Sequence, residues 1–138
     1  MIQFDSADID CPSFLTNKTK NWIELVAESF NVKVGELFFV FCSDEFLYEM
    51  NVKYLNHSTY TDIITFDLSN SPQYLSGELY ISFDRINENS QSMNQSVELE
   101  TYRVMIHGVL HLLGFKDKLP HEETEMRLQE DKCLSLLA

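Results

Sequence analysis

The sequence predicts an α+β fold of α/β-like character, in which a small, mixed and mostly parallel four-stranded sheet is packed with about five helices. Short apolar runs rich in β-branched and aromatic residues alternate along the chain with longer segments of helical periodicity. No repeat, low-complexity tract or linker interrupts the 138 residues, so we expect a single domain over residues 1–138. A chain of this length can bury a hydrophobic core of its own.

Four short segments have the composition of strands. Residues 1–4 alternate weakly, and residues 36–42 form an almost continuous apolar run that is typical of a strand buried on both faces. Residues 62–67 and 77–82 are rich in β-branched and aromatic side chains, and Asn-Ser-Pro at residues 70–72 predicts a loop between them. These four segments are the expected strands of the sheet.

Four longer segments have helical periodicity together with recognisable start signals. They are residues 16–30, a segment that begins after Ser43, residues 96–113 and a final segment that begins at Pro120. Residues 87–95 are polar and predict a short helix or a loop, preceded by Asp84 as a capping residue. The predicted order of the main elements is therefore βαβαββαα.

The third of these helices contains the most informative pattern in the chain, H-x-x-x-H-x-x-G-x-x-D. Residues four apart share one face of a helix, so His107 and His111 present their imidazoles side by side. Gly114 can end the helix in a left-handed turn, which lets Asp117 fold back toward the two histidines. Two imidazoles, one carboxylate and an open fourth position are a plausible donor set for catalytic Zn²⁺. The pattern predicts one Zn²⁺ bound by His107, His111 and Asp117.

A purely structural interpretation of the same residues is also open. The helix around both histidines is apolar, so each imidazole could be a core group that pairs with backbone carbonyls, and Gly114 could be an ordinary helix C-cap. A buried imidazole needs a polar partner, however, and a metal ion would supply one. We therefore favour the metal site.

Composition limits the classes of function. The formal net charge is −12, which counts against an RNA or DNA substrate unless a local basic patch or a metal ion offsets it. No stretch approaches the roughly 20 apolar residues that span a bilayer, and no signal peptide is apparent. The three cysteines are unclustered, which indicates free thiols in a reducing cytoplasm. Acidic residues near the C-terminus are expected to form a solvated helix face: Glu122, Glu123, Glu125, Glu130 and Asp131.

Three segments and one shorter pattern, all within residues 51–130, match the motifs of one family. Residues 51–66 are similar to N-x-x-[YF]-R…T-D-V-L-S-F, residues 76–81 to L-G-D-I-x-I, and residues 107–114 to H-G-x-L-H-L-x-G, while residues 126–130 carry Met-Arg-x-x-Glu. The chain thus resembles the YbeY-type endoribonucleases, bacterial rRNA maturation factors. The resemblance implies a cytoplasmic, metal-dependent endoribonuclease for single-stranded RNA that acts at the 3′ end of small-subunit rRNA and in ribosome quality control. It also implies ribosomal proteins or GTPases as partners, and no membrane.

The sequence departs from this family's pattern at two positions. The family has a third His where this chain has Asp117, and His121 is the rival for that ligand position. We expect Asp117 to be the ligand, because it lies six residues after the second His, as in the family, whereas His121 lies at the start of the next helix. Leu55 stands where the family commonly has an Arg that handles substrate, and leucine cannot contact phosphate. Lys53 or Lys116 could replace that Arg.

The bound Zn²⁺ of such a hydrolase lowers the pKa of water toward 7, and in a ribonuclease either water or the substrate 2′-hydroxyl can attack. For the acid–base partner the sequence offers His57 and Glu78, with Thr61 and Asp62 as structural groups or supports for the ligands. His57 could equally be an exposed loop residue.

Two other functions remain open from the sequence. A zinc peptidase would need a Glu directly after the first His of the motif, where this chain has Gly108. A non-catalytic ribosome-assembly factor could keep the metal for folding alone, and the missing Arg and the acidic composition favour it. Metal-dependent cleavage of RNA would separate that class from the ribonuclease.

Overall fold

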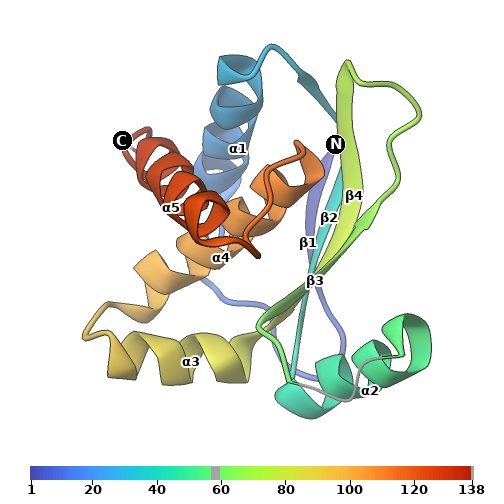
Figure 1. Ribbon diagram of the computed structural model, residues 1–138. Helices are drawn as coiled ribbons and strands as arrows, with labels where there is room; N and C mark the ends of the chain where they lie inside the picture. Colours follow the sequence, from blue (N-terminus) through green and yellow to red (C-terminus); the bar gives the residue numbers. More distant parts are fainter. Residues whose placement is uncertain (57–59, 138) are drawn as a thin grey trace.

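The computed structural model describes residues 1–56 and 60–137, which form one four-stranded sheet and five helices (Figure 1). In chain order the elements are β1 (Ile2–Ser6), α1 (Asn17–Ser29), β2 (Lys33–Cys42), α2 (Asp44–Leu55), β3 (Ile63–Asp67), β4 (Tyr74–Ser82), α3 (Phe83–Ser92), α4 (Val97–Leu112) and α5 (Pro120–Leu134). The strand order is β1-β2-β4-β3, in which β1, β2 and β4 are parallel and β3 runs antiparallel to β4. The mixed, mostly parallel sheet expected from the sequence is confirmed.

Serine side chains determine where three of the helices begin. The hydroxyls of Ser43, Ser82 and Ser96 each accept a hydrogen bond from the backbone N–H three residues later. The cap at Ser82 begins a full helix, α3, in the region where the sequence left a short helix or a loop open. Asp84, expected as the capping residue, lies instead in the first turn of α3, where its negative charge favours the helix N-terminus.

Helices cover the two faces of the sheet unequally. In Figure 1, α1, α4 and α5 lie on one side of the sheet, and α2 lies on the other side at one end. Along β2, Leu37, Phe39 and Phe41 are fully buried, whereas the alternating Phe38 and Val40 remain partly exposed. The expected burial of this strand on both faces is therefore wrong, because α2 covers only part of the second face.

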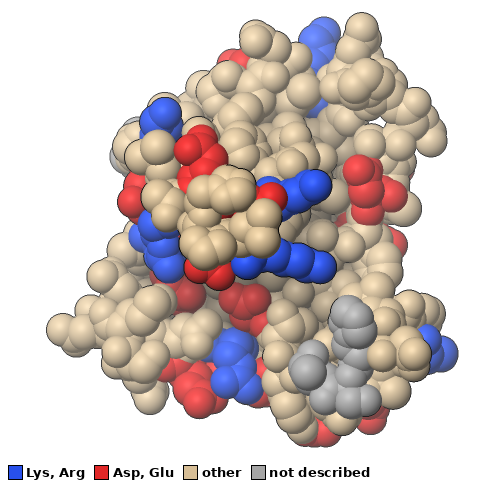
Figure 2. All heavy atoms as spheres, viewed as in Figure 1, with Lys and Arg blue, Asp and Glu red and all other residues tan. Residues whose placement is uncertain are grey.

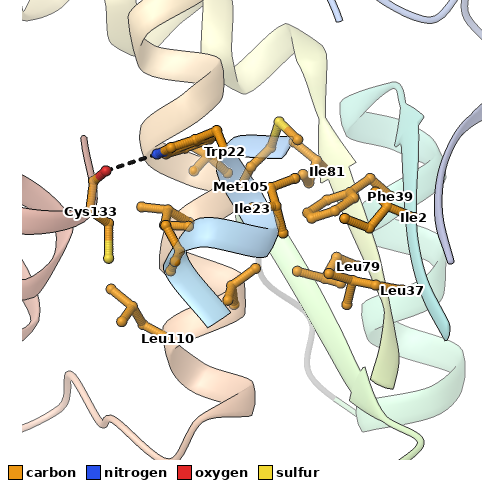
Figure 3. Close-up of a cluster of buried hydrophobic side chains, with 14 of the residues drawn as sticks. Ile2, Trp22, Ile23, Leu37, Phe39, Leu79, Ile81, Met105, Leu110 and Cys133 are labelled. Carbon is orange, nitrogen blue, oxygen red and sulfur yellow. Dashed lines mark hydrogen bonds between the residues drawn. The ribbon is translucent and has the colours of Figure 1, made fainter. Parts of the chain in front are cut away.

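The main core lies between the sheet and the helices α1, α4 and α5 (Figure 3). Leu79 and Ile81 of β4 and Met105 and Leu110 of α4 are completely buried in it. The indole Nε1–H of Trp22 donates a hydrogen bond of 2.8 Å to the Cys133 carbonyl, which fastens the C-terminal end of α5 to α1. Helix α5 also packs against α4, which places Glu130 of α5 beside His107 of α4.

Among the described residues, no helix combines the length and apolar character needed to cross a membrane. Cys11, Cys42 and Cys133 are all free thiols, as the sequence predicts.

Candidate metal centre

The two histidines of the motif lie on one face of α4, one turn apart. His107 and His111 are partly buried, and their ring centroids are 4.6 Å apart. Between them, Gly108 lets α4 approach the sheet closely, since a Cβ atom there would lie 2.5 Å from Leu79 Cδ2 and 2.6 Å from Ile63 Cδ1. The close packing of α4 on β3 and β4 thus fixes where the imidazoles point.

The chain turns back directly after α4. Gly114 has φ +105°, in the left-handed region that favours glycine, and its N–H donates to the His111 carbonyl at 3.0 Å. Phe115 N–H donates to the Leu110 carbonyl at 3.0 Å, which completes the end of the helix. This turn brings the Asp117 carboxylate to the imidazoles, as expected from the sequence.

Three donor atoms form a nearly equilateral triangle. His107 Nε2 lies 3.0 Å from His111 Nε2, and Asp117 Oδ2 lies 3.1 Å and 3.2 Å from these two nitrogens respectively. In a tetrahedral zinc site with bonds of about 2.0–2.1 Å, donor atoms are roughly 3.3 Å apart. The observed separations match one face of such a tetrahedron, so this donor set fits a metal ion with a fourth position open.

Glu130 of α5 orients one of these imidazoles. Its carboxylate is only 5% exposed, and Oε2 accepts a hydrogen bond of 2.7 Å from His107 Nδ1. Oε1 accepts a second bond of 3.0 Å from Arg103 Nη1. A proton held on Nδ1 leaves the lone pair on Nε2, the atom that faces His111 and Asp117. Carboxylate partners of this kind commonly support metal-ligating histidines.

The pKa values of this pair shift in opposite directions. Burial favours the neutral form of His107, but the hydrogen bond and the negative charge of Glu130 outweigh it and raise the imidazole pKa. Burial likewise opposes ionisation of Glu130, whereas its bonds to His107 and Arg103 lower the pKa of the carboxyl. A metal ion at Nε2 would replace the proton that the acidic surroundings otherwise stabilise.

A cavity of about 370 Å³ opens over the three donor atoms. Thr61 and Asp62, which the sequence analysis considered as supporting groups, line it. Burial raises the pKa of Asp62 above its usual range, and the charge of His107 opposes this effect. Leu55, at the position of the family Arg, lines the same cavity. Asp62 therefore lies where it can contact a molecule bound at the centre.

The structure does not bring every expected residue to this cavity. The neighbours of Glu78 on β4, Gly77 and Leu79, both approach side chains or backbone of α4. Because side chains alternate across a strand, Glu78 points to the opposite face of the sheet, next to Tyr80. His121 is exposed in the first turn of α5 and is not part of the cluster of donor atoms. His57 lies outside the described residues.

The two lysines considered as replacements for the family Arg differ in position. Lys53 lies with its Nζ 5.3 Å from the centre of the Tyr54 ring and does not line the cavity. Lys116 is exposed, one residue before Asp117. Gly108 also counts against a zinc peptidase, because the Glu that such an enzyme needs at this position would collide with Leu79 and Ile63.

The contact of Glu130 with His107 was not predicted from the sequence, in which Glu130 was expected on a solvated helix face. That expectation is correct for Glu123, Glu125 and Asp131, which are exposed, and wrong for Glu130, which is buried. Glu122 is half-buried. The signal was present in the spacing of α5, because Glu130 follows Met126 by four residues and precedes Cys133 by three. All three are buried.

Comparison with known proteins identifies the family. The family described as "Endoribonuclease YbeY" matches residues 1–138. The chain is 47% identical over 119 residues to a protein of Christiangramia forsetii, with 85% of this chain and 81% of that protein covered. It is 40% identical over 138 residues to a protein of Phocaeicola vulgatus, with 100% and 99% covered. Both relatives are named "Endoribonuclease YbeY".

The solution structure of TM1509 from Thermotoga maritima has the same fold. Its TM-score is 0.72 at 24% sequence identity, and the alignment covers 99% of this chain and 89% of that one. Fold and site together define a small α+β protein with a candidate centre of two histidines and one carboxylate. The chain belongs to the endoribonuclease YbeY family.

Proposed function

We propose that this chain is a metal-dependent endoribonuclease that cleaves single-stranded rRNA during maturation of the small ribosomal subunit, at the 3′ end of its rRNA. The observation that carries the proposal is the triangle of donor atoms, with edges of 3.0, 3.1 and 3.2 Å, in a chain of the YbeY family. A cavity beside this triangle leaves room for substrate. Two relatives that align with this chain over most of their length are named as endoribonucleases.

The metal that we propose is Zn²⁺, one per chain, held by Nε2 of His107, Nε2 of His111 and Oδ2 of Asp117. Imidazole nitrogen and carboxylate oxygen are ordinary zinc donors, and three of them leave one position open for catalysis. When bound, Zn²⁺ polarises a phosphoryl oxygen and lowers the pKa of water toward 7. Glu130 contributes by holding His107 with its Nδ1–H bound, so that Nε2 faces the metal.

For proton transfer we propose Asp62. Its carboxyl lines the cavity, and burial raises its pKa above the usual range of an aspartate, which makes it a better proton acceptor. It would accept the proton of the attacking hydroxyl, whether this belongs to water or to the 2′-position of the substrate. His57 remains a second candidate. Replacement of the 2′-hydroxyl at the cleaved position by hydrogen separates the two nucleophiles, because only attack by water survives it.

The substrate phosphate needs positive charge that Leu55 cannot provide. Lys116 and Lys118 are exposed in the segment between α4 and α5, next to Asp117. On the face shown in Figure 2, basic side chains project over this region, while acidic side chains surround them. We propose that Lys116 takes the phosphate contact that the Arg makes in the family.

A second candidate function is a non-catalytic, zinc-binding factor in ribosome assembly. Leu55 in the cavity and the net charge of −12 favour it. Under either function we expect a cytoplasmic protein that contacts the small ribosomal subunit, with ribosomal proteins or a GTPase as further partners.

Cleavage of a single-stranded RNA by the purified protein, with metal content measured on the same sample, tests the proposal. We expect about one Zn²⁺ per chain, loss of cleavage with a chelator, and recovery on return of Zn²⁺. Asp62→Asn should lower kcat by roughly 10²–10⁴ while the metal stays bound. Full zinc occupancy without cleavage of any RNA would leave the assembly factor as the remaining function.

A further inference from the structure

A second cavity, of about 290 Å³, adjoins the candidate metal centre. Asp62 and His107 line both cavities, so the two share a wall. The other polar residues around the second cavity are Asn89, Ser92, Glu100, Arg103, Arg127 and Glu130. Its volume is slightly below the roughly 300–1,000 Å³ typical of small-molecule sites, which suits a single ring system.

Glu100 is the unusual residue of this second cavity. Its side chain is only 4% exposed, and its Oε1 atom has no hydrogen-bond partner among the described residues. Burial raises the pKa of the Glu100 carboxyl, although the positive charge of Arg103 opposes this. A buried acceptor without a partner destabilises the fold, because it has lost its hydrogen bonds to water and gained none within the protein. A ligand that donates a hydrogen bond to Oε1 would remove that cost.

The lining of the cavity narrows the class of ligand. Arg103 and Arg127 bring two positive charges to a cavity that the carboxyls of Asp62, Glu100 and Glu130 also line, so the opposite charges largely balance. Among the described residues, His107, His111 and Asp117 form the one group with the spacing of metal ligands. A neutral N–H or O–H group of a ligand can supply the donor that Glu100 Oε1 lacks. A carboxylate only accepts, so a ligand edge with two adjacent N–H groups fits it best.

Guanine has such an edge. Its N1–H and its exocyclic amino group lie side by side and can meet both oxygens of one carboxylate, whereas uracil presents mainly carbonyl oxygens. Proteins recognise single-stranded RNA through hydrogen bonds to such base edges and through stacking of bases on Arg guanidinium planes. Arg127, whose side chain is 60% exposed, lies at this cavity and can provide the stacking plane.

The position on α4 connects this cavity to the metal centre. Glu100, Arg103 and His107 succeed one another on one face of the helix. Seven residues of helix separate Glu100 from His107 by about 10 Å along the axis. A nucleotide whose phosphate lies at the metal centre, or its neighbour, can place a base at that distance.

We propose that the cavity around Glu100 is a base-recognition subsite, in which the carboxylate accepts N–H groups of a guanine close to the cleaved phosphate. This inference rests on the proposed action on RNA and adds a preference for one base. Recognition at this depth requires an unstacked base, which agrees with a single-stranded substrate.

The test uses uridine heptanucleotides in which one guanosine or one inosine occupies each position in turn. Inosine lacks only the exocyclic amino group of guanosine, so the two probes differ by one donor. Fluorescence anisotropy of labelled RNA gives the affinity for the full-length protein, and cleavage of the same RNAs is measured in parallel. At one position we expect guanosine to exceed both inosine and uridine by roughly five- to a hundredfold in affinity.

Glu100→Gln and Glu100→Ala should abolish this preference. Glu98→Gln is the matched control, since Glu98 is an exposed residue of the same helix whose replacement removes the same charge. Glu100→Asp keeps the charge but withdraws the carboxylate, and it should weaken the preference even if the other variants fold poorly. Thermal unfolding of each variant identifies any that do.

Equal binding of all three probes by the wild-type protein overturns the inference, and so does a preference that survives Glu100→Gln. Cleavage without base preference overturns the subsite and leaves the proposed function standing. A guanine preference that depends on Glu100, without cleavage of any RNA, overturns the proposed function and supports the subsite.

Discussion

Glu130 and Glu100 are two buried glutamates beside the same helix, and their surroundings differ sharply. Glu130 is 5% exposed and both of its oxygens accept hydrogen bonds, from His107 and Arg103. Glu100 is 4% exposed and its Oε1 has no partner among the described residues. The first carboxyl has a lowered pKa and the second a raised one. Burial alone therefore does not set the direction in which the pKa of a carboxyl shifts, because hydrogen-bond donors at the carboxylate can outweigh it.

The difference divides α4 into two regions. Around its C-terminal half, His107, His111 and Asp117 form a group that could hold a metal ion, and Glu130 binds the other side of the His107 ring. Beside its N-terminal half, Glu100 lines a cavity, and its buried Oε1 has no hydrogen-bond partner among the described residues. We infer that the donor atoms of the first region are already in place for a metal ion, whereas Glu100 in the second region needs a hydrogen-bond donor from its ligand.

Removal of both histidines should have the largest effect on the first region. In His107→Ala combined with His111→Ala, only Asp117 of the three donors remains, so we expect loss of the bound metal and of RNA cleavage by about 10³-fold or more. Elemental analysis and a cleavage assay measure the two quantities. Wild-type metal content in the double variant would contradict the assignment of these ligands.

Replacement of the third donor tests whether the carboxylate belongs to the set. Asp117→Ala should lower zinc affinity by at least about tenfold, because it removes a ligand. His121→Ala is the control, since His121 is exposed and lies outside the donor cluster. Competition with a chromogenic chelator gives both affinities. Metal loss in His121→Ala, with retention in Asp117→Ala, would reverse the assignment.

A smaller effect is expected where the histidine loses its orienting partner. Glu130→Gln keeps the size of the side chain but weakens the bond to His107 Nδ1, and zinc affinity should fall by roughly 10–100-fold. Asp131→Asn provides a matched control, because Asp131 contacts the same Arg103 nitrogen at 3.3 Å but is 58% exposed. Equal zinc affinity in both variants would mean that Glu130 does not act through His107.

The smallest effect concerns stability in the second region. Glu100→Gln removes a buried charge that lacks a partner, so the free energy of unfolding at neutral pH should rise by on the order of 1 kcal/mol. A carboxyl with a raised folded-state pKa destabilises the fold above that pKa, and the penalty disappears as the pH falls to the ordinary value of 4.5. The gain should therefore vanish near pH 4, as measured by urea unfolding at several pH values. A gain that persists there would have another cause.

Most of the architecture, and the three candidate metal ligands of the site, could be predicted from the sequence. The alternation of apolar runs with segments of helical periodicity was sufficient to locate the four strands, because each run has the length and composition of a strand. The spacing of His107, His111, Gly114 and Asp117 predicts their convergence, since all four belong to one helix and its terminal turn. Local geometry therefore carries this part of the information.

The remaining features depend on contacts between distant segments. Glu130 was expected at the surface of its helix, and its burial, like that of Glu100, depends on the packing of α5 and α3 against α4. Glu78 is a plausible catalytic carboxylate until the close approach of Gly108 to Leu79 shows which face of the sheet α4 covers. The sequence provides the alternation of strand residues, but the tertiary packing decides which of the two faces becomes the site.

Gly114 connects the end of α4 with the candidate metal centre. A Cβ atom at this position would meet no other atom within 4 Å, so the glycine is needed for its φ of +105° and not for space. An alanine there would strain the backbone by roughly 1–2 kcal/mol, which most folded proteins survive. The same strain would act on the short arm that carries Asp117. Replacement of Gly114 would therefore disturb the position of Asp117 as well as the end of α4.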